Sequence, residues 1–213
     1  MASPREMRYD LAGRRLVEVF NKHGFETSYA ASKAEALEKA LSYIDREKDL
    51  VSWGGCHSAE ECGLLEALRD GTYRILDRST AKTPEEKVEF SRQALLSDVF
   101  IGGANALSAT GELVNIDGNG NRVAAMSYGP KTVIVIAGMN KVMPDLDSAF
   151  KRARGVASPI NCQRFGLDTP CSKLGLCADC NSPDRICNNF QVIVRCKPVG
   201  RIKLILVGDD LGY

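Results

Sequence analysis

The sequence has almost no net charge, because 28 Lys and Arg residues stand against 27 Asp and Glu residues. Proteins that bind nucleic acid or anionic membranes through their overall charge are typically strongly basic, so neither partner is expected. Long apolar runs are also lacking. The longest, Val133–Gly138, is far too short to cross a bilayer, and residues 1–10 lack the apolar stretch of an export signal. We therefore expect a cytoplasmic protein.

Two common nucleotide-binding motifs are missing as well. Neither G-x-G-x-x-G nor G-x-x-x-x-G-K-[ST] occurs in the sequence, which removes the best support for a nicotinamide dinucleotide site or a P-loop. What is present is a chain of 213 residues that is 44% hydrophobic and 26% charged, the usual composition of a globular protein. No repeat or linker divides it, so a single domain over residues 1–213 is predicted.

Helix and strand signals alternate through the first half of the chain. The expected helices cover residues 5–23, 32–44, 58–68 and 84–95, and the expected strands cover 25–30, 49–53, 73–76 and 98–101. Such alternation is typical of an α/β fold, in which helices cover both faces of a mixed, largely parallel sheet.

The second half carries different signals. Residues 117–121 are rich in Gly and Asn, which tolerate positive φ, so residues 112–116 and 122–126 are expected to pair as a hairpin. A buried strand over 131–137 and a helix over 145–154 should follow, with closing strands over 191–195 and 202–207. Residues 155–190 show no periodicity, and a loop of that length inside a compact domain indicates a functional role.

Cysteine is the unusual residue of this chain. Of eight cysteines, Cys171, Cys177, Cys180 and Cys187 lie in one short segment, which predicts a metal site because thiolates prefer soft metals and a reducing cytosol disfavours disulfides. The segment has one Cys-x2-Cys knuckle instead of the two typical of structural zinc, so a 4Fe–4S cluster is the first hypothesis. Zinc is the second, and unligated thiols are the third. Two cysteines outside the segment are alternative outer ligands, Cys162 and Cys196.

A second group of residues predicts an anion site. Glycines after the strand over 98–101 would let backbone N–H groups approach a phosphate or carboxylate closely. Asn side chains nearby would donate hydrogen bonds, and Arg122 would be the main fixed positive charge. The predicted ligand-binding residues are Gly102, Gly103, Asn105, Asn115, Asn119, Asn121 and Arg122. The alternative is that these glycines only turn the chain.

Two isolated residues are weaker candidates. His57 follows a Gly-Gly pair, where it would serve as a helix cap or a general base, and Lys141 follows the central strand, where it would reach a ligand. Each has a competing structural explanation, since a lone histidine is more often packed and a lysine is more often solvated. No catalytic residue is assigned from the sequence.

Taken together, these motifs resemble the LUD (lactate utilisation) domain family. The resemblance rests on residues 105–111, 114–126, 128–131 and 206–213, while residues 170–187 resemble the cysteine-bearing branch of its stand-alone members. It implies an α/β sandwich similar to the ribose-5-phosphate isomerase and CoA transferase-like fold. Asn105 stands where sugar-phosphate isomerases of that fold carry an aspartate, which argues against isomerase chemistry by their route.

The resemblance also implies a function, since family members act in the oxidation of L-lactate beside iron–sulfur subunits. Three hypotheses follow. The chain is an iron–sulfur protein with an anion cleft in lactate or related carboxylate metabolism, or a non-redox transferase or isomerase with structural zinc, or a non-enzymatic electron-transfer or regulatory partner of a lactate-oxidising complex. The expected partner is a small anionic metabolite, with a redox protein and a second copy of the chain as further candidates. Whether the chain is an enzyme stays open.

Overall fold

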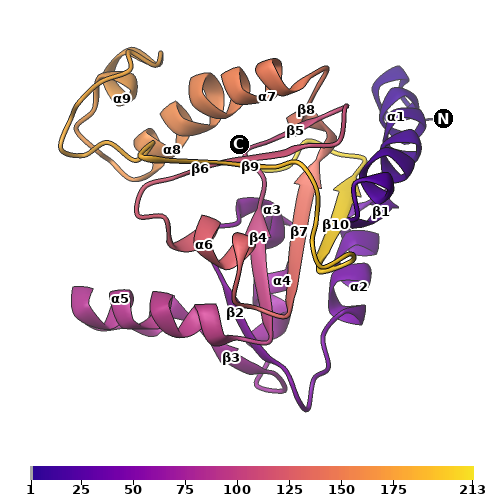
Figure 1. The fold of residues 1–213 in the computed structure, drawn as a ribbon, viewed down its shortest axis with the longest axis horizontal. Helices are drawn as coiled ribbons and strands as arrows, with labels where there is room; N and C mark the ends of the chain where they lie inside the picture. The colour runs from indigo at the N-terminus through magenta and orange to yellow at the C-terminus, as the bar shows by residue number, and fades with distance from the viewer. Residues whose placement is uncertain (1) are drawn as a thin grey trace.

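The structure, a computed structural model, describes residues 2–213 and contains two sheets (Figure 1). The larger sheet has six strands in the order β1-β10-β7-β4-β2-β3, and every neighbouring pair is parallel. Its strands are β1 (Glu26–Ala30), β2 (Leu50–Trp53), β3 (Arg74–Leu76), β4 (Val99–Gly103), β7 (Thr132–Gly138) and β10 (Ile202–Val207). The smaller sheet has the order β8-β5-β6-β9, with β5 (Ala106–Ser108), β6 (Leu113–Asp117), β8 (Val142–Met143) and β9 (Asn189–Ile193).

Helices cover both faces of the larger sheet. Those before the smaller sheet are α1 (Pro4–Lys22), α2 (Lys33–Ser42), α3 (His57–Glu61), α4 (Leu64–Leu68) and α5 (Pro84–Gln93). Those after it are α6 (Asn121–Ser127), α7 (Leu146–Arg152), α8 (Ser158–Arg164) and α9 (Pro170–Leu174). A π-helical segment, Ala153–Ala157, joins α7 to α8, so these elements run on as one long helix. None of the helices in residues 2–213 has the length and apolar character needed to span a membrane.

The central strand β7 shows why its sequence is apolar throughout. Val133 and Val135 pack into the core under α1 and α6, whereas Ile134 and Ile136 pack into the core under α2, α3 and α4. A parallel strand covered on both faces needs apolar residues at every position, not at alternate ones. The smaller sheet adds a further layer, because Leu113 faces the first core while Val114 packs outward against α7.

The fold class predicted from the sequence is confirmed, because a largely parallel sheet is enclosed by helices. The predicted hairpin is wrong, since residues 121–127 form α6 instead of a strand. The physical reason is Asp117, whose Oδ2 accepts hydrogen bonds from the backbone N–H groups of Arg122 (3.0 Å) and Val123 (3.2 Å) and so stabilises the start of a helix.

Two other predictions need correction. Residues 155–190 are not wholly irregular, because they contain the end of the π-helical segment, α8 and α9. The single helix expected over 58–68 is two short helices, which Gly63 separates with a φ of 76°. The smaller sheet as a separate unit was not predicted.

Candidate functional site

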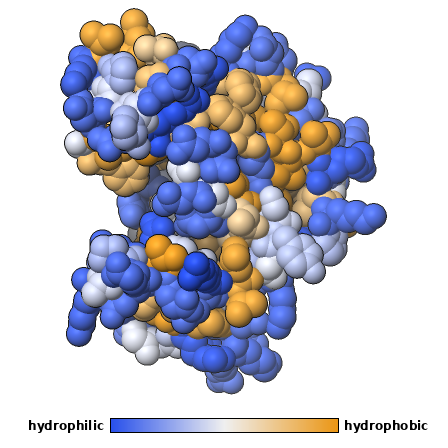
Figure 2. Space-filling view, turned by 60° about the vertical axis from the view of Figure 1, so that its left-hand side comes forward, coloured by the Kyte–Doolittle hydropathy of each residue, from blue (hydrophilic) through white to orange (hydrophobic). Residues whose placement is uncertain are grey.

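A cleft with a cavity volume of about 280 Å³ lies at the carboxyl ends of the parallel strands. Residues after β2, β3, β4 and β7 form one side of it, and α8 together with residues 185–186 forms the other. Figure 2 shows a hollow between the part of the molecule that carries α8 and α9 and the part that carries α5. Ligands of open α/β sheets typically bind at this edge, so the topology itself places a candidate site here.

The cleft is lined with positive charge. Its cationic side chains are Arg78, Arg122, Lys141, Arg164 and Arg185. Arg122 is 3.7 Å from a carboxylate oxygen of Asp117, and Arg185 is 3.3 Å from one of Asp179. For the other three cations, no carboxylate oxygen of residues 2–213 lies within 4.0 Å. An anionic ligand would supply the missing partner.

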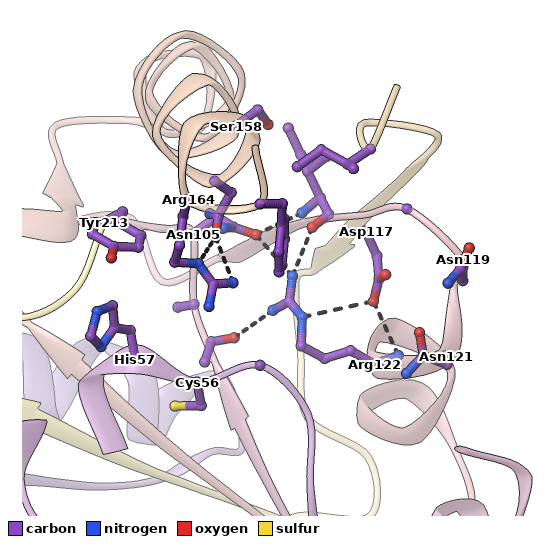
Figure 3. A pocket seen from close by; sticks show the side chains of 18 of the residues that line it. Cys56, His57, Asn105, Asp117, Asn119, Asn121, Arg122, Ser158, Arg164 and Tyr213 are labelled. Carbon is purple, nitrogen blue, oxygen red and sulfur yellow. Dashed lines mark hydrogen bonds and ion pairs between the residues drawn. The ribbon is translucent and has the colours of Figure 1, made fainter. Parts of the chain in front are cut away.

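Arg122 occupies a different position from the one expected. Its guanidinium lies in the wall of the cleft, but its Nη1 donates to Gly103 O (3.0 Å) and Asn115 Oδ1 (2.7 Å), and its Nη2 donates to Asn105 Oδ1 (3.0 Å) and Ile116 O (2.7 Å) (Figure 3). Those four N–H groups are therefore committed to the protein. Burial lowers the pKa of Arg122 from its ordinary value, with Asp117 opposing the shift. Arg122 thus ties the end of β4 to β6.

The glycines and asparagines of the predicted anion site fall into two groups. Gly103, Asn105, Asn119 and Asn121 line the cleft together with Arg122. Gly102 lies inside β4, where its carbonyl accepts a hydrogen bond from the thiol of Cys56 at 3.1 Å.

Asn115 is fully buried beneath the site. Its Oδ1 accepts hydrogen bonds from Asn105 N (3.2 Å) and from Arg122, so it supports the cleft wall without facing the cavity. The structure therefore places the predicted residues at or beneath one cleft, and the sequence did not distinguish the residues that face the cavity from those that support them.

Several lining residues were missed by sequence reasoning. These residues come from elements that lie far apart in the chain. They are Arg78, Ser158, Asn161, Arg164, Arg185 and Tyr213. An isolated arginine carries no local pattern, so only the spatial convergence of β3, α8 and the cysteine segment reveals these side chains. The Arg164 guanidinium contacts only the Asn161 amide (3.1 Å) and the Phe165 ring, which leaves its charge without a counterion in residues 2–213.

The two isolated candidates do reach the cleft. Lys141 is 4% exposed, and its Nζ donates to Ser58 Oγ at 3.0 Å. Burial lowers the pKa of Lys141 to about 8. The His57 ring lies edge-on to Tyr213, with centroids 4.9 Å apart, and its Nδ1 is 3.2 Å from a carboxylate oxygen of Glu60.

The predicted metal ligands gather around a second, much smaller cavity. Cys171, Cys177, Cys180 and Cys187 all line it, and Cys162 from α8 joins them. All five are free thiols. Cys196 lies elsewhere, with its Sγ 3.2 Å from Pro198 O. No group of three or more His, Cys, Asp or Glu side chains within residues 2–213 is already arranged as a set of metal ligands.

The cysteine cavity and the cleft share a wall. Ser158, Arg185 and Ile186 line both. Arg185 also holds the cysteine segment in place, because its Nε donates to Cys187 O (3.1 Å) and its Nη1 donates to Cys180 O. A group bound by the cysteines would therefore be a direct neighbour of a ligand in the cleft.

Comparison with known proteins identifies the family. The sequence pattern of the LUD domain matches residues 13–207, which is most of the chain. The chain belongs to the LUD domain family. This membership supports a role related to lactate utilisation. No curated protein matches the sequence of this LUD-domain protein.

One of the solved structures that this chain resembles agrees with it at the level of the fold. A DUF162 family protein from Deinococcus radiodurans is similar to this LUD-domain protein over 93% of this chain and 97% of its own, with 10% identity and a TM-score of 0.52. Ribose 5 phosphate isomerase A from Neisseria gonorrhoeae is 19% identical over 55% of this chain and 56% of its own, with a TM-score of 0.34. Translation initiation factor eIF-2B from Pyrococcus horikoshii OT3 is 16% identical over 54% and 48%, with a TM-score of 0.37.

Proposed function

We propose that this LUD-domain protein binds a small carboxylate or phosphate metabolite in its cleft and carries a 4Fe–4S cluster beside it, in lactate or related carboxylate redox metabolism. The observation that carries the first part is the set of unpaired cations, Arg78, Lys141 and Arg164, that line one cavity. Lys141 is buried and Arg78 is half-buried, and such cations are costly without counterions. Their convergence on one cavity with the exposed Arg164 favours an anionic ligand.

The set of cysteine thiols around the smaller cavity supports the proposed 4Fe–4S cluster. Cys171, Cys177, Cys180 and Cys187 would hold it, and Cys162 is the alternative to an outer ligand. Four thiolates are the usual ligands of a 4Fe–4S cluster, and short irregular segments supply them without breaking regular hydrogen bonding. When bound, such a cluster would accept or donate one electron at a time. The shared wall at Arg185 would bring that chemistry next to the ligand.

The cluster is tested by preparing the protein without oxygen, with iron and sulfide supplied. We expect a brown protein with about four iron and four sulfide per chain, whereas zinc would leave it colourless because its d shell is full. Cys177→Ser should lose the colour. Cys196→Ser is the matched control and should keep it, because Cys196 lies outside the cysteine cavity. A colourless protein with one zinc per chain would contradict the cluster.

The anion site is tested by calorimetric titration with L-lactate, pyruvate and inorganic phosphate. Arg78→Ala and Arg164→Ala should each weaken binding by about 1.5–3 kcal/mol, the range for a hydrogen bond to a charged group. Arg14→Ala is the control, since Arg14 lies on α1 and pairs with Asp10 on the surface. Unchanged affinity in both cleft variants would place the anion elsewhere. The redox protein partner and the homodimer stay predictions.

A further inference from the structure

Lys141 differs from the other cations of the cleft. It carries a primary amine, whereas the other four carry guanidinium groups, which are not deprotonated in proteins. It lies in the 3-10 turn Met139–Lys141, directly after the central strand β7. Its one hydrogen-bond partner within residues 2–213 is the Ser58 hydroxyl, a neutral group. The amine is therefore held at the cleft with no carboxylate of residues 2–213 within ion-pair distance, 4.0 Å.

The surroundings of Lys141 favour the uncharged amine. Burial is the largest cause of the lowered pKa, and the positive charges of Arg152 and Arg122 act in the same direction. The carboxylate of Glu61 acts against it, and Cys56 would do so as a thiolate, but they do not restore the ordinary value. A desolvated lysine near other cations is the usual setting of a nucleophilic amine.

We propose that Lys141 is the nucleophile of the cleft and forms an imine with the carbonyl carbon of an anionic oxo compound. This inference rests on the proposed anion site, because Arg78 and Arg164 would hold the anionic group while the carbonyl faces Lys141. A C–N double bond forms, the nitrogen gives up both of its protons, and the carbonyl oxygen leaves as water. No oxidant or reductant is consumed. The Ser58 hydroxyl, 3.0 Å from Nζ, would pass a proton from nitrogen to the departing oxygen.

The test uses pyridoxal 5′-phosphate, an anionic aldehyde, followed by borohydride, which reduces an imine to a stable amine. Peptide mass spectrometry then locates the label. At pH 7 an amine with a pKa of about 8 is uncharged about 300-fold more often than a lysine of ordinary pKa. We expect Lys141 to be labelled at least tenfold faster than any other lysine, with a rate that rises through a midpoint near pH 8.

Three variants sharpen the result. Lys141→Arg keeps the positive charge and should remove the label. Lys131→Arg is the control and should leave it unchanged, because Lys131 is exposed and pairs with Asp98 on the surface. Ser58→Ala should slow the labelling at least tenfold. A label spread over surface lysines of the wild-type protein, with Lys141 unmodified, would overturn the inference without depending on how any variant folds.

A second arm separates this inference from the anion site on which it rests. Pyridoxal lacks the phosphate, and inorganic phosphate competes only at an anion site. If pyridoxal labels Lys141 as fast as its phosphate ester and phosphate does not compete, the nucleophile is supported and the anion site is wrong. If phosphate binds the cleft but neither pyridoxal phosphate nor pyruvate is trapped on Lys141, the anion site is supported and the nucleophile is wrong.

Discussion

Arg122 shows how far the role of one residue depends on its partners. The sequence places it in a Gly- and Asn-rich turn beside other polar groups, where it is the natural anchor for an anion. In the structure its side chain is only 12% exposed, and its guanidinium donates to acceptors of β4, of β6 and of Asn105 between β4 and β5. Its charge contributes to the field of the cleft, but its hydrogen bonds stabilise the fold.

Replacing Arg122 by Ala should therefore act on stability first. The change removes four partly buried hydrogen bonds, and only Asn105 Oδ1 and Asn115 Oδ1 are known to keep another donor, so we expect the free energy of unfolding to fall by about 3 kcal/mol or more. Arg78→Ala is the matched control, since no hydrogen bond or ion pair within residues 2–213 uses the Arg78 guanidinium, and it should change stability by about 0.5 kcal/mol or less. Denaturant unfolding measures both. Equal, small losses would contradict this view of Arg122.

Replacing each of two glycines by alanine should change the free energy of unfolding in opposite directions, because one lies inside a helical segment and the other precedes a helix. Gly155 lies in the π-helical segment, and a Cβ added there meets nothing within 4 Å. Gly155→Ala should raise the free energy of unfolding by about 0.5–1 kcal/mol, because alanine loses less backbone entropy in a helix. Gly120 precedes α6 with a φ of 83°, which alanine adopts only with strain. Gly120→Ala should therefore lower the free energy of unfolding by about 1–2 kcal/mol. The same sign for both changes would contradict these assignments.

The elements that the sequence predicts well are those with a clear period. The apolar run of β7 and the capped helix α1 are examples, and both lie within a few residues of their expected bounds. Residues 117–127 were misread because Gly and Asn signal a turn whichever element follows it. The carboxylate of Asp117 stabilises a helix after this turn, through hydrogen bonds that a pattern of turn residues does not reveal.

The residues of the cleft also divide into those that the sequence predicts and those that it does not. Gly103 and Asn105 follow a strand and were expected at its carboxyl end, as they are. Arg78 and Arg164 were not expected, because nothing in their immediate sequence links them to a site. Their convergence depends on the parallel order of the larger sheet and on the long helix that brings α8 over the strand ends.

At the scale of the whole molecule, the cysteine segment is peripheral to the large cores. Residues 173–179 are all exposed, and among the five cysteines of the cavity only Cys187 belongs to an apolar cluster. In the metal-free protein, Cys177→Ser should therefore shift the thermal midpoint by about 2 °C or less. Removing a bound metal with a chelator should speed trypsin cleavage after Lys173 at least several-fold. Equal cleavage with and without metal would show that these cysteines do not hold it.

Ser158, Arg185 and Ile186 line both cavities, so an anion bound in one and a metal bound in the other would adjoin the same side chains. Whatever factor a bound anion applies to the affinity of the cysteines for metal, the metal must apply the same factor to the affinity for the anion. Arg185 is the residue through which this coupling would run, since it lines the cleft and donates to the carbonyls of Cys180 and Cys187. If both proposed ligands bind and are coupled in this way, the anion affinity would change with the metal content of the sample.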